Sequence, residues 1–290
     1  MSETDATQAN AEQRAFWDEQ AGPTWVALQE RLDAGIRPHG ELVAEVLAAR
    51  PGERILDVGC GCGDTTLRLA AQVAPGGEVL GVDLSGPMLS RARERARQAG
   101  RRNVSLRQAD AQTTALEAGS FDAVHSRFGV MFFDHPESAF ANLRKAVRPG
   151  GRLAFVCWRA PAQNPWILVP MAAVAPLLTL PAPPPPNAPG MFALANPGQI
   201  RTVLEGAGWS EVRVVARDVA MRLGRGSLEE AVETFLEVGP VAGALREAGA
   251  DEAMRAKVAA AVSNAYLEAS QGGPLALGSA VWLASARNPA

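Results

Sequence analysis

The chain has 290 residues, of which 47% are hydrophobic, and its 28 basic and 31 acidic residues give a formal net charge of −3 at pH 7. This balance argues against a protein that coats nucleic acid or a membrane surface, because both need an excess of basic residues. No apolar run reaches the roughly 18 residues of a membrane span, and no signal peptide opens the sequence. We therefore expect a cytoplasmic protein with one large α/β domain and an appended subdomain.

Two helices are predicted ahead of the first strand. Apolar residues recur at helical spacing over residues 11–33, and a second helix is predicted over residues 41–49. Between them, His39 is flanked by Pro38 and Gly40, two residues typical of turns. We therefore expect His39 to lie at the surface.

From residue 51 onward, strand and helix patterns alternate with short turns. Strands are expected near residues 54–58, 78–82, 103–107, 121–126 and 152–157, and helices near 64–73, 86–98 and 137–147. This alternation implies right-handed crossovers and a parallel sheet, so the predicted fold class is α/β.

The pattern changes after Trp158. Residues 160–195 are rich in proline and are expected to form irregular chain or polyproline II, as in a lid or a linker. A helix is then predicted at 196–207, a strand at 209–219, a helical insertion at 228–271 and a closing strand at 276–286.

The turn after the first strand is the most informative segment. Glycine stands at positions 59, 61 and 63, and a helix begins at Asp64. The glycines let a ligand lie directly on the main chain, and the helix N-terminus behind them offers free N–H groups. A dinucleotide fingerprint needs glycine at position 64, where this chain has aspartate. An NAD-dependent oxidoreductase is therefore the weaker hypothesis for this turn.

Together with the acid before it, Asp57-x-Gly59-x-Gly61-x-Gly63 resembles motif I of the class I S-adenosylmethionine-dependent methyltransferases. Four later segments agree with that family in order and spacing, at residues 78–83, 108–111, 120–127 and 148–153. Over its whole length the chain resembles bacterial small-molecule methyltransferases of the UbiE-like kind, and the resemblance is looser beyond residue 158. The resemblance implies a Rossmann-like, doubly wound sheet of seven mostly parallel strands, the last one antiparallel, with helical lid insertions.

The resemblance also implies the cofactor S-adenosyl-L-methionine and its product S-adenosyl-L-homocysteine. Asp83 ends the second strand, where a carboxylate accepts hydrogen bonds from ribose hydroxyls, and Asp110 resembles the family's acid near the adenine amino group. Helix capping explains Asp110 almost as well, and Asp57 alternatively fixes the turn from inside the sheet. The predicted cofactor residues are Asp57, Gly59, Cys60, Gly61, Gly63, Thr65, Asp83, Leu84, Met88, Ala109, Asp110, Ala111, Ser126 and Arg127.

The methyl acceptor must be aligned with the cofactor and shielded from water. Aromatic and apolar side chains suit that task because they exclude solvent and tolerate a nearby cation. The side chains expected to line this substrate pocket are Trp17, Trp25, Phe128, Met131, Phe132, Trp158 and Trp166, with ordinary core packing as the alternative. Phe128, Met131 and Phe132 directly follow the fourth strand, where α/β ligands bind.

A general base is harder to identify. His125 lies on the fourth strand and is expected to be a satisfied sheet histidine. His135 is the best catalytic candidate, with packing at a helix N-terminus as its alternative. Arg127 either steers an anionic substrate or pairs with a local acid. Cys60 and Cys62 are too close together for an ordinary zinc pair, so no metal is expected.

Arginines gather between residues 91 and 102, where a helix is expected. Helical spacing spreads them around the helix, and no aromatic side chains interleave to stack on bases. We therefore expect a solvated helix face and no nucleic-acid partner.

Four segments are predicted: a helical lid at 1–50, a cofactor-binding core at 51–158, a proline-rich lid loop at 159–195, and a C-terminal part at 196–290 with a helical substrate cap at 228–271. They predict a methyltransferase that passes a methyl group to a small, partly apolar molecule by in-line displacement, as a monomer or homodimer. The alternatives are a SAM-binding protein without methyl transfer and the NAD-dependent oxidoreductase. The acceptor atom, O, N, S or C, is left open.

Overall fold

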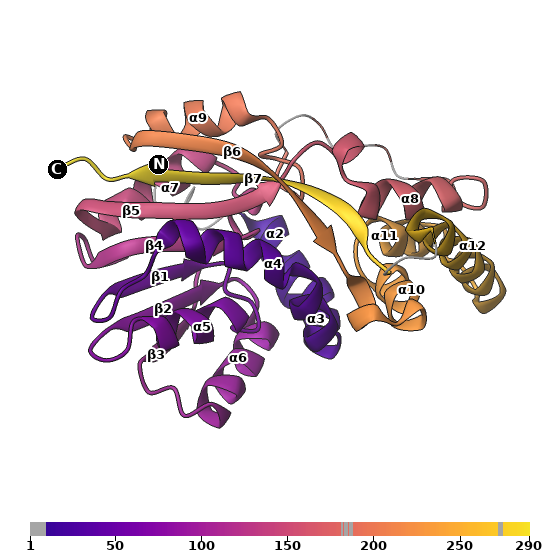
Figure 1. Cartoon of the computed structure of the whole chain (residues 1–290), viewed down its shortest axis with the longest axis horizontal. Helices are drawn as coiled ribbons and strands as arrows, with labels where there is room; N and C mark the ends of the chain where they lie inside the picture. The colour runs from indigo at the N-terminus through magenta and orange to yellow at the C-terminus, as the bar shows by residue number, and fades with distance from the viewer. Residues whose placement is uncertain (1–9, 181, 183–184, 186–187, 272–274) are drawn as a thin grey trace.

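Seven strands form one sheet in the order β3-β2-β1-β4-β5-β7-β6 (Figure 1). The computed structural model describes residues 10–180, 182, 185, 188–271 and 275–290. The strands are β1 (Arg54–Val58), β2 (Glu78–Asp83), β3 (Val104–Gln108), β4 (Phe121–Arg127), β5 (Val147–Trp158), β6 (Ser210–Met221) and β7 (Leu277–Arg287). The first five pair in parallel, and β7 runs antiparallel to both β5 and β6. This topology confirms the predicted Rossmann-like sheet with an antiparallel last strand.

Helices cover the sheet and continue beyond one end of it (Figure 1). The N-terminal helices are α2 (Ala11–Ala15), a π-helix (Phe16–Ala21), α3 (Gly22–Ala27) and α4 (Gln29–Leu47). Those between the parallel strands are α5 (Asp64–Gln72), α6 (Gly86–Gln98) and α7 (Pro136–Ala146). The later ones are α8 (Pro165–Val174), α9 (Pro197–Gly206), α10 (Leu228–Glu237), α11 (Pro240–Glu247) and α12 (Glu252–Ser270).

The helical insertion predicted between the last two strands is the three-helix unit α10–α12. In Figure 1 it lies with α8 beyond one end of β6 and β7, and α8 packs against α12. Across the described ranges, none of the helices combines the length and apolar character needed to cross a membrane.

The central parallel strands β1 and β4 are buried on both faces, as their apolar sequences require, whereas the edge strand β3 is largely exposed. Ile55 and Leu56 of β1 and Val124 of β4 are completely shielded from solvent. On one face, the ring of Phe140 in α7 lies 5.4 Å from that of Phe155 in β5, and both are buried. This core fixes where the carboxyl ends of β1 to β4 stand.

Helix α4 runs unbroken from Gln29 to Leu47, so the turn predicted at residues 38–40 is wrong. Pro38 lies inside the helix, and His39 is fully buried instead of lying at the surface. One face of α4, which includes the fully buried Val43, packs against β4 and β5. Burial of that face outweighs the backbone hydrogen bond that proline removes.

Residues 165–174 form the helix α8, which corrects the expectation of irregular chain throughout 160–195. Pro165 stands in its first turn, where the missing N–H costs little. Burial of Trp166 and contacts with α12 and β7 hold the helix in place. Most of the proline string at 181–187 lies outside the described residues.

Replacing a fully buried ring should test how much this core contributes to stability. We expect Phe140→Ala to lower the free energy of unfolding by about 3–5 kcal/mol, because it leaves a cavity between α7 and β5. Urea denaturation measures the change. Leu267→Ala on α12 is the control, because Leu267 is 48% exposed and its truncation should cost less than about 0.5 kcal/mol. Similar losses for both variants would contradict this account.

Candidate functional site

The carboxyl ends of four neighbouring strands bring predicted cofactor residues to one edge of the sheet. Because the strand order is β3-β2-β1-β4, this edge carries Asp110 after β3 and Asp83 at the end of β2. The glycine turn (residues 59–63) follows β1, and Arg127 ends β4. Open α/β sheets bind their ligands at such an edge.

Asp57 lies behind the glycine turn. Its buried carboxylate accepts hydrogen bonds from the hydroxyls of Thr65 and Thr66, at 2.8 and 2.6 Å, and His125 Nδ1 lies 2.8 Å from its other oxygen. Burial acts to raise the pKa of Asp57, but the attraction of His125 and these hydrogen bonds outweigh it and hold the pKa below its ordinary value. The geometry favours the alternative in which Asp57 fixes the turn, and His125 is a hydrogen-bonded sheet histidine, as expected.

Two glycines leave bare main chain at the cavity. Gly59 and Gly61 have φ angles of +68° and +53°, in the left-handed region that glycine tolerates. A Cβ atom on Gly59 would stand 2.6 Å from the Cα of Gly129, and one on Gly61 would stand 2.8 Å from the Cε of Met88. A side chain at either position would collide with neighbouring protein atoms, so close packing as well as the backbone conformation requires glycine here.

Asp83 offers hydrogen-bond acceptors next to this turn. One carboxylate oxygen accepts the backbone N–H of Gly61 at 2.7 Å, and the other accepts that of Ser85 at 2.9 Å. Each oxygen has two lone pairs, so each can accept one further donor. Burial raises the pKa of Asp83, and these two N–H groups oppose the rise. A ligand with two hydroxyl groups fits the remaining capacity.

Asp110 meets a residue of the N-terminal segment. Asn10 is 2% exposed, and its amide nitrogen donates to both oxygens of Asp110, at 3.1 and 3.2 Å. The backbone N–H of Gln112 donates to the same carboxylate at 2.9 Å, a local bond of the kind that capping implies. Burial raises the pKa of Asp110, and the bonds from Gln112 and Asn10 oppose the rise. No local signal in the sequence connects Asn10 with this acid.

A single cavity is bordered by most of the predicted site residues. From the predicted cofactor set it includes Gly59, Cys60, Gly61, Asp83, Leu84, Met88, Ala109, Asp110, Ala111 and Arg127. All the side chains predicted to face the acceptor border it too: Trp17, Trp25, Phe128, Met131, Phe132, Trp158 and Trp166. Polar groups at the strand ends and aromatic side chains therefore share one space.

Four predicted cofactor residues support the turn without bordering the cavity: Asp57, Gly63, Thr65 and Ser126. The Thr65 hydroxyl is used by Asp57, and the fully buried Ser126 donates to the Val58 carbonyl at 2.8 Å. Gly63 precedes α5 with a φ of +83°. Their contacts fix neighbouring backbone, so their predicted direct contact with the cofactor is not supported by their positions.

Phe128, Trp158 and Trp166 form an aromatic wall of the cavity. The rings of Phe128 and Trp158 are stacked, with centroids 4.1 Å apart and planes 13° apart, and Trp166 lies 4.9 Å from Trp158. Phe128 has a φ of +65°, which is costly for a bulky residue. Stacking on Trp158 and a backbone hydrogen bond to Val156 at 3.1 Å hold it there. The wall thus offers a flat apolar surface.

The N-terminal segment supplies the second aromatic group of the cavity. Trp17 makes edge-to-face contacts with Trp25 and Phe132, at centroid distances of 5.7 and 5.0 Å. These contacts join the π-helix and α3 to the short turn that follows β4. The N-terminal helices therefore cover the cavity instead of extending away from it.

His39 packs behind the aromatic wall. Its ring lies 5.3 Å from Phe128 and 5.1 Å from Trp158, and its Nε2 lies 2.8 Å from Ser279 Oγ. The Ser279 hydroxyl also lies 2.8 Å from the Val219 carbonyl, so it connects the imidazole to β6. Burial lowers the pKa of His39 to about 4, and the ring is therefore neutral at pH 7.

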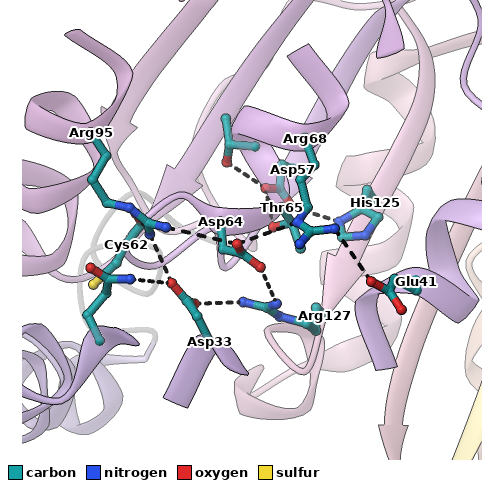
Figure 2. Close-up of polar contacts among 12 residues, drawn as sticks. Asp33, Glu41, Asp57, Cys62, Asp64, Thr65, Arg68, Arg95, His125 and Arg127 are labelled. Carbon is teal, nitrogen blue, oxygen red and sulfur yellow. Dashed lines mark hydrogen bonds and ion pairs between the residues drawn. The ribbon is translucent and has the colours of Figure 1, made fainter. Parts of the chain in front are cut away.

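Asp33, Asp64, Arg95 and Arg127 form a charge ring at the β4 end of the cavity (Figure 2). Arg127 donates to Asp64 at 2.9 Å and to Asp33 at 3.3 Å. Arg95 donates to Asp33 at 3.0 Å and to the Cys62 carbonyl of the glycine turn at 2.7 Å. Arg127 thus pairs with local acids, one of its two predicted alternatives. The expectation that the arginines of α6 form a solvated face is wrong for Arg95, because its side chain pairs with the buried Asp33.

His135 does not border the cavity, so its position gives no support to the catalytic role predicted for it. It is exposed at the start of α7, and its backbone N–H donates to Gln112 Oε1 at 2.8 Å. The alternative, packing at a helix N-terminus, describes this position. Histidine is absent from the described residues that border the cavity.

Several bordering residues have no signal in the sequence beyond helical spacing or apolar character. They come from α4 and from the C-terminal half of the chain: Gln29, Asp33, Ile36, Met191, Met221, Leu223, Thr234 and Phe235. Periodicity shows which side of a helix is apolar, but the tertiary fold decides which residues of that side reach the cavity.

Comparison with known proteins places the chain among methyltransferases. A sequence profile described as a methyltransferase domain matches residues 55–151. The chain is 31% identical over 194 residues to the nocamycin O-methyltransferase of Saccharothrix syringae, which covers 64% of this chain and 69% of that protein. It is 37% identical over 122 residues to the ubiquinone/menaquinone biosynthesis C-methyltransferase UbiE of Ectopseudomonas mendocina, covering 42% of this chain and 47% of UbiE. The match thus spans about half the length of this second relative.

The fold is also similar to solved structures. The crystal structure of the [4+2]-cyclase SpnF matches with a TM-score of 0.57 at 20% identity, covering 93% of this chain and 96% of that chain. At this identity the likeness concerns the fold alone, and a shared fold does not fix the reaction.

The buried His39 should make stability depend on pH. In the unfolded chain His39 takes up a proton below pH 6.5, whereas in the folded protein it stays neutral until about pH 4. The free energy of unfolding should therefore fall by about 3 kcal/mol between pH 7 and pH 4 from this group, at about 1.4 kcal/mol per pKa unit. Urea denaturation across this pH range should show a smaller fall in the free energy of unfolding for His39→Gln than for the wild-type protein. The control His135→Gln should keep the wild-type slope; equal slopes for all three proteins would contradict this account.

Proposed function

The chain belongs to the class I S-adenosylmethionine-dependent methyltransferase family, and we propose that its acceptor is a small, mostly apolar, ring-bearing molecule bound against the aromatic wall. One observation carries the proposal: the cavity joins the strand-end carboxylates and bare glycine turn to the stacked rings of Phe128 and Trp158. A flat apolar ligand stacked there lies in the same space as the groups proposed to hold the cofactor.

The residues at the sheet edge fit this cofactor. When bound, S-adenosylmethionine supplies a methyl group already activated on a sulfonium. We propose that Asp83 accepts hydrogen bonds from the ribose hydroxyls, since each of its oxygens can accept one further donor. Asp110 would accept from the adenine amino group, and the backbone of Gly59 and Gly61, which borders the cavity, would lie along the cofactor between these groups and the sulfur.

We propose that positioning and exclusion of water supply most of the catalysis. The polar side chains bordering the cavity are Asn10, Gln29, Asp33, Asp83, Asp110, Arg127 and Thr234. Asp33 is already paired with two arginines, and Asp83 and Asp110 lie on the cofactor side. An acceptor that loses its proton in water near neutral pH, such as an acidic phenol, an enol or an acidic C–H group, needs no base from the protein. The names of the O- and C-methyltransferase relatives agree with such acceptors.

We further propose that the segments outside the core form the lid. The N-terminal segment contributes Trp17 and Trp25, α8 contributes Trp166, and α10 contributes Phe235 to the border of the cavity. These elements flank the parallel core at 51–158. Substitutions in them can therefore change which acceptor the protein prefers without changing the part of the site proposed to hold the cofactor.

A direct test incubates the protein with S-adenosylmethionine and a panel of polycyclic phenols and quinols. We expect S-adenosylhomocysteine to form in step with a methylated product, detected by mass spectrometry. Cofactor bound without product across a broad panel would favour a SAM-binding protein without methyl transfer. Calorimetric titration with NAD is the companion experiment, and tighter binding of NAD than of S-adenosylmethionine would overturn the proposal.

Removing the stacked ring of Trp158 should weaken binding of the acceptor more than binding of the cofactor. We expect Trp158→Ala to raise KM for the best acceptor of that panel about tenfold or more, because the flat apolar contact is lost. The Kd for S-adenosylhomocysteine should change less than about threefold. Trp282→Ala is the matched control, since Trp282 lies on β7 outside the cavity border. Equal effects of both substitutions on KM would contradict an acceptor site at Trp158.

Neutralising Asp83, the acid at the end of β2, should weaken binding of the cofactor directly. We expect Asp83→Asn to raise the Kd for S-adenosylhomocysteine about tenfold or more, since hydrogen bonds to a charged group contribute about 1.5–3 kcal/mol. Calorimetry measures the change. Asp218→Asn, at an 84% exposed side chain on β6, should leave the Kd unchanged. An unchanged affinity of Asp83→Asn for S-adenosylhomocysteine would contradict a role for Asp83 in binding the cofactor.

A further inference from the structure

One side of α10 forms part of the border of the cavity. Thr234, Phe235 and Val238 all border it, and their spacing of one, three and four residues places them on the same side of the helix. The helix belongs to the three-helix unit α10–α12, which lies beyond one end of β6 and β7 (Figure 1). This unit therefore contributes directly to the space in which the acceptor is proposed to bind.

The position of α10 is fixed by its neighbours. It packs against the short 3₁₀ segment Leu223–Gly226, which packs in turn against α4. A Cβ atom on Gly224 would stand 2.2 Å from the backbone nitrogen of Ala231 in α10, so these two elements are in close contact. The packing of the protein thus holds Thr234 in place beside the cavity.

Thr234 is the polar member of an otherwise apolar group. Beyond residue 158, the described residues that border the cavity are Trp166, Met191, Met221, Leu223, Thr234, Phe235, Val238 and Gly239. Thr234 supplies the one side-chain oxygen in this group. The indole N–H of Trp166 is already used, because it donates to Asn164 Oδ1 at 3.2 Å. A polar group of a ligand that lies in this part of the cavity therefore meets Thr234.

The hydroxyl of Thr234 can accept a further hydrogen bond. It donates to the Glu230 carbonyl, one turn earlier in α10, at 2.7 Å. A hydroxyl oxygen also carries two lone pairs, and none of the described residues donates a hydrogen bond to this one. Because Thr234 is only 3% exposed and borders the cavity, a ligand in the cavity is the donor best placed to reach it.

The matching chemistry is a hydroxyl or N–H group on a mostly apolar molecule. A carbonyl or ether oxygen in the same place has no proton to donate, so it would face the Thr234 oxygen without a hydrogen bond. An ionised group is disfavoured, because the surrounding side chains are apolar and leave its charge unpaired. A site with a buried acceptor atom of this kind favours ligands that have the donor over analogues that lack it.

We propose that Thr234 selects acceptors that carry a hydroxyl or N–H group in addition to the atom that is methylated, and that its oxygen accepts the hydrogen bond from this group. This inference rests on the proposed function, because it concerns the same acceptor site. Stacking on Phe128 and Trp158 fixes the plane of a ring but leaves its rotation within that plane free. A hydrogen bond to Thr234 removes this freedom and so decides which atom of the acceptor faces the methyl group.

Binding of naphthalene diols tests the proposal, because they differ from 1-naphthol by one hydroxyl group. Calorimetry with S-adenosylhomocysteine present compares 1-naphthol with the dihydroxynaphthalenes that share its 1-hydroxyl group. We expect at least one diol to bind the wild-type protein about fivefold or more tightly than 1-naphthol. Thr234→Val has nearly the same shape but no hydroxyl, and should bring the two affinities within about twofold of each other. Thr234→Ser has the hydroxyl and should retain the preference.

Thr202→Val is the matched control. Thr202 on α9 makes the same kind of bond, to the Gly198 carbonyl one turn earlier at 3.1 Å, but it is exposed and does not border the cavity. Its substitution should leave the preference for the diol unchanged. An unchanged preference in Thr234→Val overturns the proposal, and so does a preference that is lost in Thr234→Ser as well.

The inference and the proposed function fail in different ways. Binding of 1-naphthol without preference for any diol contradicts the role of Thr234 alone. A preference for a diol that depends on Thr234, without methylation of any acceptor, contradicts the proposed methyl transfer alone. Binding of none of these probes contradicts both.

Discussion

The carboxylate of Asp57 joins the elements on which the whole site is built. It accepts hydrogen bonds from Thr65 and Thr66 at the start of α5, and it is paired with His125 on β4. All of these partners are buried, so an acid missing here would leave donors unsatisfied in the interior, at about 1–3 kcal/mol each. The glycine turn lies directly above this anchor. The residues proposed to contact the cofactor on either side of the turn take their positions from it.

The sheet edge can be predicted from the sequence because each of its parts is local. Asp83, Asp110 and the glycine turn each come at or just after the end of a strand, and the parallel order of the strands decides which of them are neighbours. The charge ring cannot be predicted in this way. Asp33 and Arg127 are 94 residues apart, and nothing in either segment marks them as partners. Their pairing depends on where α4 crosses the sheet, which is a property of the tertiary packing.

His39 and α8 show how packing overrides local signals. A histidine between proline and glycine favours a turn, yet burial of one face of α4 keeps the helix intact through Pro38. Pro165 and Pro170 likewise favour irregular chain, and contacts with α12 stabilise a helix around them. Both errors fall in segments that surround the cavity. The half of the site proposed to face the acceptor is therefore the half that local sequence patterns describe least well.

β7 is the last strand along the chain, yet in the sheet it lies between β5 and β6. The one neighbour of β6 in the described sheet thus follows it only after α10–α12. Until β7 is synthesised, β6 lacks the strand that pairs with it in the described sheet, and the unpaired edge of a strand can join another chain. Early folding of the three helices would bring the returning strand close to its place. The three helices α10–α12 would then limit how long the nascent chain exposes an unprotected edge.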